Sequence, residues 1–400
     1  MSAEILGAGA LIAPADTALA PFRAAVGGVT VRFGAGCLAE LGQEARRIGA
    51  RRALLVTDAG VAAAGHVERA LETLAAAGVA VEVFAEVPEN PTGASLAPGA
   101  ERCRQVDADL LVAVGGGSAL DAAKGINFLA TQGGVMEDYW GHGKANRAML
   151  PAIGVPTTAG TGSDAQSYAV LNHTEKEEPG DRHGRKMACG DDKARFRTIL
   201  LDPELAVTAP RAVRASAGMD ALSHAVESLV TKRGNALSQL YAVGAWNLLE
   251  PAFEEALEPV PAVETMGAML LGAHFAGAAI EASMLGAAHA AANPLTARFG
   301  IVHGQAVALM LPQVVRWNGA EVSATYARLV GEGPRAAERL ALRLEELRRQ
   351  AGLPERLSAL GIAREELPRL AARAAREWTG TFNPRPVGLA EFLGLYEAAY

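Results

Sequence analysis

The chain has 400 residues and a formal net charge of −7, with 37 lysines and arginines against 44 aspartates and glutamates. This length exceeds what one hydrophobic core usually organises, so we expect two domains. The acidic balance and the absence of a long basic block argue against a nucleic-acid partner. The sequence also has no uninterrupted apolar run of the roughly 18 to 20 residues that span a membrane.

Cysteine use and the first residues predict a cytoplasmic protein. The cysteines, Cys37, Cys103 and Cys189, are odd in number and far apart, which does not suggest a disulfide framework. Residues 1–27 are predicted to be an N-terminal extension. Its apolar centre lacks a basic start and is interrupted by Pro14, so it does not resemble a signal peptide.

Residues 28–208 are predicted to form an α/β domain. From residue 50, short apolar runs alternate with helical patterns, which is typical of a parallel sheet covered by helices. The pattern predicts elements in the order strand 51–58, helix 60–78, strand 79–87 and strand 109–118. Apolar segments that extend or flank the sheet lie at 150–158, 167–173 and 196–203. The highly charged segment 173–197 is interpreted as an exposed hairpin or loop.

Residues 209–400 are predicted to form an all-α domain. Almost all of this region has helical periodicity, with alanine- and leucine-rich runs such as 261–292 and 334–350. Proline, threonine and alanine around 207–210 suit a linker before a helix start, which places the boundary near residue 208.

A glycine-rich turn follows an apolar strand in the sequence GGGSALDAAK. Gly116 and Gly117 allow a ligand to approach the backbone closely. Ser118 and Asp121 follow in the first turn of a helix, whose N-terminus favours a pyrophosphate. Leu120 stands where the dinucleotide fingerprint has its third glycine, so a tight structural turn is an equal alternative.

A second loop, VPTTAGTGSDAQS, offers the hydroxyl groups of Thr157, Thr158, Thr161 and Ser163. In isolation such hydroxyls are more typical of a loop that caps its own backbone. Two such loops in one α/β domain together indicate a nucleotide site. Asp58 ends an early strand and can accept from a ribose 2′-hydroxyl, which favours NAD over NADP, although a plain turn aspartate is an equal alternative.

The helical domain contains four candidate metal ligands, Asp220, His224, His289 and His303. Asp220 and His224 are four residues apart, which places both on one helix face, within an apolar segment where an unpartnered pair is costly. One carboxylate and three imidazoles suit Fe²⁺ or Zn²⁺ with a position left for substrate. Taken singly, each residue has a simpler explanation as an ion pair, a buried histidine or a helix-cap histidine.

Together these motifs resemble the iron-containing, or group III, alcohol dehydrogenases, whose relatives include glycerol dehydrogenases and dehydroquinate synthases. The similarity covers about residues 28–400 and is carried by GGGSALDAAK, PTTAGTGSD, GMDALSHAVE, the spacing of His289 and His303, HGQAVALMLP and NPRP. It implies a dehydroquinate synthase-like architecture, with a metal in the cleft between an α/β dinucleotide-binding domain and a helical domain. It also implies a homodimer or larger homo-oligomer.

The resemblance assigns the metal to the four candidates above, a set that favours the alcohol dehydrogenase branch over the synthase branch. It implies cofactor contacts from Asp58, Asn90, Gly116, Gly117, Ser118, Asp121, Thr157, Thr158, Thr161, Ser163 and Lys186. One departure is Asn293, because many members have a histidine there, near the nicotinamide, that is thought to aid proton transfer. His142 and His274 are conceivable substitutes, although each is more often structural or solvent-facing.

The expected function is a metal-dependent NAD(H) alcohol dehydrogenase, or aldehyde or ketone reductase, in which the metal is the Lewis acid and hydride moves to or from the nicotinamide. Two alternatives stay open. A dehydroquinate synthase-like lyase would need a basic cluster for its polyanionic substrate, and a non-catalytic NAD-binding protein would leave the metal set unexplained. The sequence does not identify the substrate, although Lys144 and Arg147 would suit an acidic aldehyde.

Overall fold

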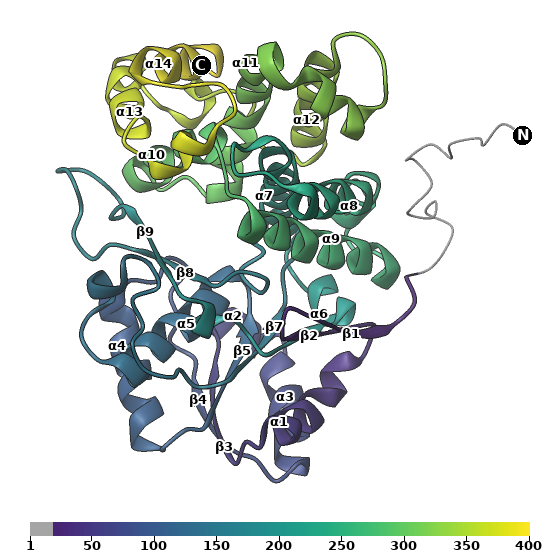
Figure 1. Ribbon diagram of the computed structural model, residues 1–400, viewed down its shortest axis with the longest axis vertical. Helices are drawn as coiled ribbons and strands as arrows, with labels where there is room; N and C mark the ends of the chain where they lie inside the picture. Colours follow the sequence, from purple (N-terminus) through teal and green to yellow (C-terminus); the bar gives the residue numbers. More distant parts are fainter. Residues whose placement is uncertain (1–18) are drawn as a thin grey trace, which may run out of the picture.

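The computed structural model describes residues 19–400, in which an α/β part is followed by a helical part (Figure 1). Residues 1–18 of the predicted N-terminal extension lie outside the described residues. The prediction is wrong for residues 22–26, which form an edge strand of the main sheet. Among residues 19–400 this strand pairs only with the strand that follows it, and its five residues give a weak apolar pattern in the sequence.

The α/β part is built on a seven-stranded sheet. All neighbouring strands are parallel except the first pair, which is antiparallel. In order across the sheet, the strands are β1 (Phe22–Val26), β2 (Val29–Phe33), β10 (Thr198–Leu201), β7 (Ala152–Pro156), β5 (Leu110–Gly115), β3 (Arg52–Val56) and β4 (Ala80–Phe84). The strands predicted at 51–58, 79–87 and 109–118 are therefore confirmed, each slightly shorter than expected.

Helices cover both faces of this sheet, as alternation along the strands requires. In β3, Leu54 and Val56 pack in the core beneath α4 (Gly93–Gln105) and α5 (Gly117–Gln132). Leu55 packs in the core on the opposite face, beneath α1 (Leu41–Ile48) and α3 (His66–Ala76). The helix predicted at 60–78 is divided into α2 (Ala59–Ala63) and α3, because Gly65 has a φ of 80°.

A smaller sheet, β6 (Gly141–His142), β9 (Lys186–Gly190) and β8 (Tyr168–Asn172), lies beside α5. Strands β8 and β9 form an antiparallel hairpin joined by residues 173–185, which we call the 173–185 loop. The charged segment is thus partly the hairpin that the sequence predicted. It is not an exposed one throughout, because Asp181 and Met187 are buried.

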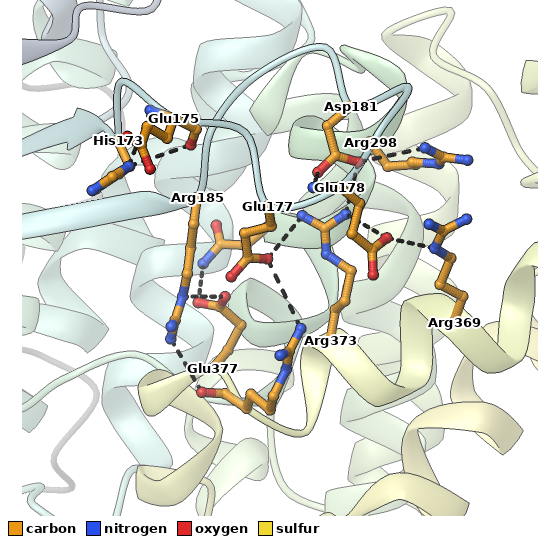
Figure 2. A network of polar contacts seen from close by, with 12 residues as sticks. His173, Glu175, Glu177, Glu178, Asp181, Arg185, Arg298, Arg369, Arg373 and Glu377 are labelled. Atoms are coloured by element: carbon orange, nitrogen blue, oxygen red, sulfur yellow. Dashed lines mark hydrogen bonds and ion pairs between the residues drawn. The ribbon is translucent and has the colours of Figure 1, made fainter.

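Ion pairs join the 173–185 loop to the helical part (Figure 2). Asp181 Oδ1 lies 2.9 Å from Nη1 of Arg373 and 3.6 Å from Nη1 of Arg298. At the rim, Arg369 Nε lies 2.5 Å from Glu178 Oε2. Arginines from the far end of the chain therefore neutralise the acidic residues of this loop, which explains its burial.

The helical part contains α6 (Pro203–Val207), α7 (Arg211–Val230), α8 (Ala236–Ala252), α9 (Val263–Ala282), α10 (Ala287–Phe299), α11 (His303–Val330), α12 (Ala336–Gln350), α13 (Leu367–Ala374) and α14 (Leu389–Ala398). Within residues 19–400, one helix, α9, is long and apolar enough to cross a membrane. Its most apolar window is 67% buried against other helices, which is typical of a core helix. The strands of the α/β part point their carboxyl ends toward this bundle (Figure 1).

Candidate cofactor and metal site

A cavity of about 1110 Å³ lies between the two parts of the molecule. It is lined by the loops after β3, β5 and β7 and by residues of α7, α10 and α11. The carboxyl ends of parallel strands are where α/β proteins bind nucleotides. All fifteen predicted site residues line it: Asp58, Asn90, Gly116, Gly117, Ser118, Asp121, Thr157, Thr158, Thr161, Ser163, Lys186, Asp220, His224, His289 and His303.

The turn from β5 into α5 brings bare backbone to the cavity. A Cβ on Gly117 would lie 2.6 Å from Oγ1 and Cγ2 of Thr161, so only glycine fits between the two predicted loops. Gly116 is the N-cap residue of α5. It has no side chain, so the backbone N–H groups of the first turn receive no capping hydrogen bond from it. The first N–H groups of this 16-residue helix therefore remain free for an anionic ligand.

Two predicted cofactor residues also have structural partners. Asp58 caps α2, since its Oδ1 accepts from the backbone nitrogens of Gly60 and Val61 at 2.9 and 3.0 Å. The interpretation as a turn aspartate is thus right in part, although Asp58 still lines the cavity. The hydroxyl of Ser118 donates to the carbonyl of Glu89, which fixes its orientation at the cavity edge.

A buried lysine fixes the second loop from below. Lys124 Nζ donates to the carbonyl oxygens of Ser163 and Tyr168 at 2.5 and 2.7 Å. Burial raises the pKa of Asp121 to about 6, although Lys124 and Lys186 oppose that shift. Burial also lowers the pKa of Lys186, against the attraction of Asp121 and Asp220. The cofactor side of the cavity therefore holds its few charges out of water.

The four candidate metal ligands converge from three helices. Asp220 and His224 lie one turn apart on α7, His289 is near the start of α10, and His303 is the first residue of α11. The Oδ1 atom of Asp220 lies 3.4, 3.6 and 3.9 Å from the Nε2 atoms of His224, His289 and His303, respectively. The Nε2 atoms of His224 and His289 are 3.1 Å apart.

These donors fit a divalent transition metal. Asp220 Oδ1 is buried and has no hydrogen-bond donor in the described part of the chain. Two metal–nitrogen bonds of 2.0 to 2.1 Å in a tetrahedron place their nitrogens about 3.3 Å apart, close to the separation of the His224 and His289 Nε2 atoms. Carboxylate and imidazole donors suit iron or zinc. The group could hold either metal, with His303, which is more exposed, completing the set.

Electrostatics in this cluster also favour a cation. Burial alone would raise the pKa of Asp220, but His224, His303 and His289 hold it below its usual range. Burial lowers the pKa values of His224 and His303. Burial would do the same to His289, yet the neighbouring carboxylates of Asp220 and Glu227 raise its pKa, Glu227 by accepting from Nδ1. An ionised Asp220 carboxylate and the imidazoles of His224 and His303 could therefore hold a cation at the centre of the cluster.

Glu227 is a candidate site residue that the sequence analysis missed. Its Oε2 accepts from Nδ1 of His289 at 2.6 Å, and its Oε1 accepts from the backbone nitrogen of Ala288 at 2.7 Å. With the proton on Nδ1, the lone pair of His289 Nε2 faces Asp220 and His224, the arrangement of a carboxylate–histidine–metal triad. Glu227 is seven residues after Asp220, so a search at helical spacing would have found it.

Most of the residues suggested for proton transfer or for an acidic substrate lie away from the cavity. Asn293 lines the cavity, but His142 and His274 do not. His274 is buried against Asp164, with its Nδ1 2.6 Å from the carboxylate. Lys144 and Arg147 are exposed and lie outside the residues that line the cavity, so this part of the acidic-aldehyde hypothesis is wrong.

The charges that line the cavity argue against a polyanionic substrate. Among the described residues, Lys186 is the single lysine or arginine of the lining. The acidic members are more numerous: Asp58, Glu89, Asp121, Asp220 and Glu281. The basic cluster that the lyase alternative requires is not present in this lining.

Two protein-family models match most of the chain. The iron-containing alcohol dehydrogenase model matches residues 29–203, and the C-terminal model of the Fe-containing alcohol dehydrogenase family matches residues 214–400. NAD-dependent methanol dehydrogenase from Bacillus methanolicus is 31% identical over 362 residues, which cover 88% of this chain and 93% of that protein.

Solved structures agree with the sequence relatives. A 1,3-propanediol oxidoreductase superposes with a TM-score of 0.87 at 30% identity, over 92% of this chain and 97% of the other. Sulfoacetaldehyde reductase from Bifidobacterium kashiwanohense in complex with NAD⁺ superposes with a TM-score of 0.83 at 28% identity, over 93% and 97%. The chain therefore belongs to the iron-containing alcohol dehydrogenase family.

Proposed function

We propose that this enzyme interconverts a small alcohol and the matching aldehyde or ketone, with NAD(H) as hydride carrier and Fe²⁺ or Zn²⁺ as metal. The observation that carries the proposal is that a bare helix N-terminus and a cluster of metal-type donors, Asp220, His224 and His289 with His303 beside them, line one cavity. A nucleotide and a metal-bound ligand can therefore meet there. The NAD-dependent and NAD⁺-bound relatives support the choice of cofactor.

The α/β part binds and orients the dinucleotide. The free N–H groups at the start of α5 receive the pyrophosphate, with hydroxyls of the second loop beside them. Asp58 retains Oδ2 for a ribose hydroxyl after Oδ1 caps α2, and its charge disfavours a 2′-phosphate. A dinucleotide held by these contacts would have its nicotinamide close to the helical part, as hydride transfer requires.

The helical part holds the metal through Asp220, His224, His289 and His303, and Glu227 fixes the tautomer of His289. A divalent metal there supplies Lewis-acid polarisation of the alcohol or carbonyl oxygen. The packing of α7, α10 and α11 around the cluster excludes water from its inner side. Asn293 cannot titrate, so the proton leaves through solvent or another group of the cavity.

Two further assignments are proposals of the same kind. All three cysteines are in the described part of the chain, unpaired and buried, which supports a reducing compartment and a cytoplasmic location. A homo-oligomer is proposed from the family resemblance. A short alcohol or aldehyde is favoured as substrate because the methanol and propanediol enzymes are named for such molecules.

The test combines metal content with turnover. Protein purified without oxygen and loaded with Fe²⁺ or Zn²⁺ is assayed for NADH oxidation with short aldehydes, ketones and acidic aldehydes, beside an Asp220→Ala/His224→Ala double variant. We expect aldehyde-dependent oxidation that the double variant loses. Stoichiometric metal and NADH binding without turnover on any carbonyl compound would reject the dehydrogenase and support a non-catalytic NAD-binding protein.

A further inference from the structure

Asn293 presents an amide to the cavity close to the metal cluster. It follows His289 by four residues on α10, so both side chains lie on one helix face, about 6 Å apart along the axis. Its Nδ2 donates to Oε2 of Glu377 at 3.0 Å. Its Oδ1 has no hydrogen-bond partner among residues 19–400, and Asn293 is half-buried in the cavity wall.

Glu377 is held in place from the opposite side of the cleft. Its Oε1 accepts from Nε of Arg185 at 3.2 Å, while Nη2 of Arg185 donates to the carbonyl of Arg376 at 3.2 Å (Figure 2). The Arg185 guanidinium also lies over the ring of Trp140, 5.6 Å from its centroid. Arg185 belongs to the α/β part and Glu377 to the helical part, so this contact forms where the two parts meet.

The chemistry of this chain of contacts determines which way the amide points. Burial raises the pKa of Glu377, but the Arg185 guanidinium, which donates to Oε1, stabilises its ionised form. An ionised carboxylate only accepts hydrogen bonds, so the NH₂ group of Asn293 must face it. The amide oxygen is then turned away from Glu377, on the side of the cavity.

We propose that Glu377, held by Arg185, locks the amide of Asn293 so that its carbonyl oxygen accepts a hydrogen bond from an N–H or O–H group of the bound ligand. This inference rests on the proposed function, because it concerns the ligands of the same cavity. The donor has one chemistry and two sources. It is either the carboxamide of the nicotinamide or a second hydroxyl of the substrate. Glu377 is a positioning residue, and Asn293 determines specificity.

The experiment compares the metal-loaded enzyme with three single variants. Glu377→Gln and Asn293→Leu change the proposed contact, and Glu366→Gln is the matched control. A glutamine at 377 can accept from Arg185 and donate to the Asn293 oxygen, so the amide can rotate without loss of packing. Glu366 also accepts from an arginine, Arg298, but does not line the cavity. The NADH dissociation constant is measured by fluorescence, and kcat/KM is measured for lactaldehyde and for propanal, which lacks the second hydroxyl.

If the donor is the nicotinamide, we expect the NADH dissociation constant to rise about three- to tenfold in both cavity variants. If the donor is the substrate, the preference for lactaldehyde over propanal falls by a similar factor in both. The Glu366→Gln control changes neither. If Asn293→Leu alone reduces NADH affinity or the preference for lactaldehyde, Glu377 does not orient the amide. If neither variant changes either quantity, the whole inference is overturned.

The proposed function can fail separately. If the unmodified enzyme reduces neither aldehyde, that failure concerns turnover on these substrates. The same comparison is then made by binding 1,2-propanediol and 1-propanol to the enzyme–NADH complex, followed by NADH fluorescence. An unchanged preference for the diol, with unchanged NADH affinity, would overturn the inference whether or not turnover occurs.

Discussion

The two walls of the cavity offer different kinds of groups to the ligands proposed for them. The α/β wall uses backbone, since the turn at Gly117 leaves the first N–H groups of α5 free. The helical wall uses side chains from α7, α10 and α11, which are distant in sequence and meet at Asp220. One short motif can therefore specify the cofactor site, whereas the metal site depends on tertiary packing. Changes in the two walls should have separable effects.

The largest effect on turnover is expected from changes in the helical wall. Asp220→Ala combined with His224→Ala removes half of the candidate ligand set and leaves two histidines from separate helices. We expect loss of bound metal and a fall in turnover of about a thousandfold or more, because Lewis-acid stabilisation contributes several kcal/mol. Metal analysis and NADH oxidation measure this. NADH affinity within about threefold of the unmodified enzyme would show that the walls are separable.

The contact between Glu227 and His289 tests the orientation of the cluster. Glu227→Ala should weaken metal affinity about 10- to 100-fold, measured by competition with a chelator. Glu227→Gln should lose less, because an amide oxygen can still accept from one of its two donors, the imidazole or the Ala288 nitrogen. Equal metal affinity in all three proteins would contradict the assigned role.

A change in the α/β wall should weaken NADH binding and leave metal binding unchanged. Gly117→Ala places a Cβ 2.6 Å from Thr161, so we expect the NADH dissociation constant to rise roughly tenfold while metal content stays constant. Gly394→Ala, in α14, is the control, because a Cβ there meets no atom within 4 Å. Unchanged NADH binding by the Gly117 variant would remove this turn from the cofactor site.

The pH dependence of stability should distinguish the metal-free from the metal-loaded protein. The carboxylates of Asp220 and Glu227 raise the pKa of His289 above its ordinary value of 6.5, so its stabilising contribution is present below pH 6.5 and lost as pH rises through the folded pKa. Burial lowers the pKa values of His224 and His303, whose contribution is present above pH 6.5 and lost at lower pH. Thermal melts of the metal-free protein, in the presence of a chelator, should give the highest melting temperature near pH 6.5. A bound metal should remove the alkaline decline.

The smallest effect is expected outside the cavity. Arg369 and Glu178 form an ion pair at the rim of the 173–185 loop with side chains 40% and 32% exposed. Arg369→Ala should lower the free energy of unfolding by less than about 1 kcal/mol and leave both NADH and metal affinity unchanged. Denaturant titration checks the first expectation. A change in either affinity would show that the rim of the loop controls the cavity.

The sequence predicted what local rules determine. The strand and helix around Gly116 follow from a buried apolar run and a turn, and the spacing of Asp220 and His224 follows from helical geometry. Edge strand β1 was missed because its short pattern carries little signal. The burial of Asp181 was missed because Arg373, its partner, is 192 residues away. The same holds for Asn293 and Glu377, whose contact spans 84 residues.

Anomalous diffraction from crystals grown with Zn²⁺ and NADH tests the central claim most directly. We predict one strong peak in the cavity, about 2.0 to 2.2 Å from the carboxylate of Asp220 and from the Nε2 atoms of His224, His289 and His303. Electron density for NADH should place the pyrophosphate at the start of α5. A metal bound elsewhere, or by residues outside this group, would contradict the claim that this cavity is the active site.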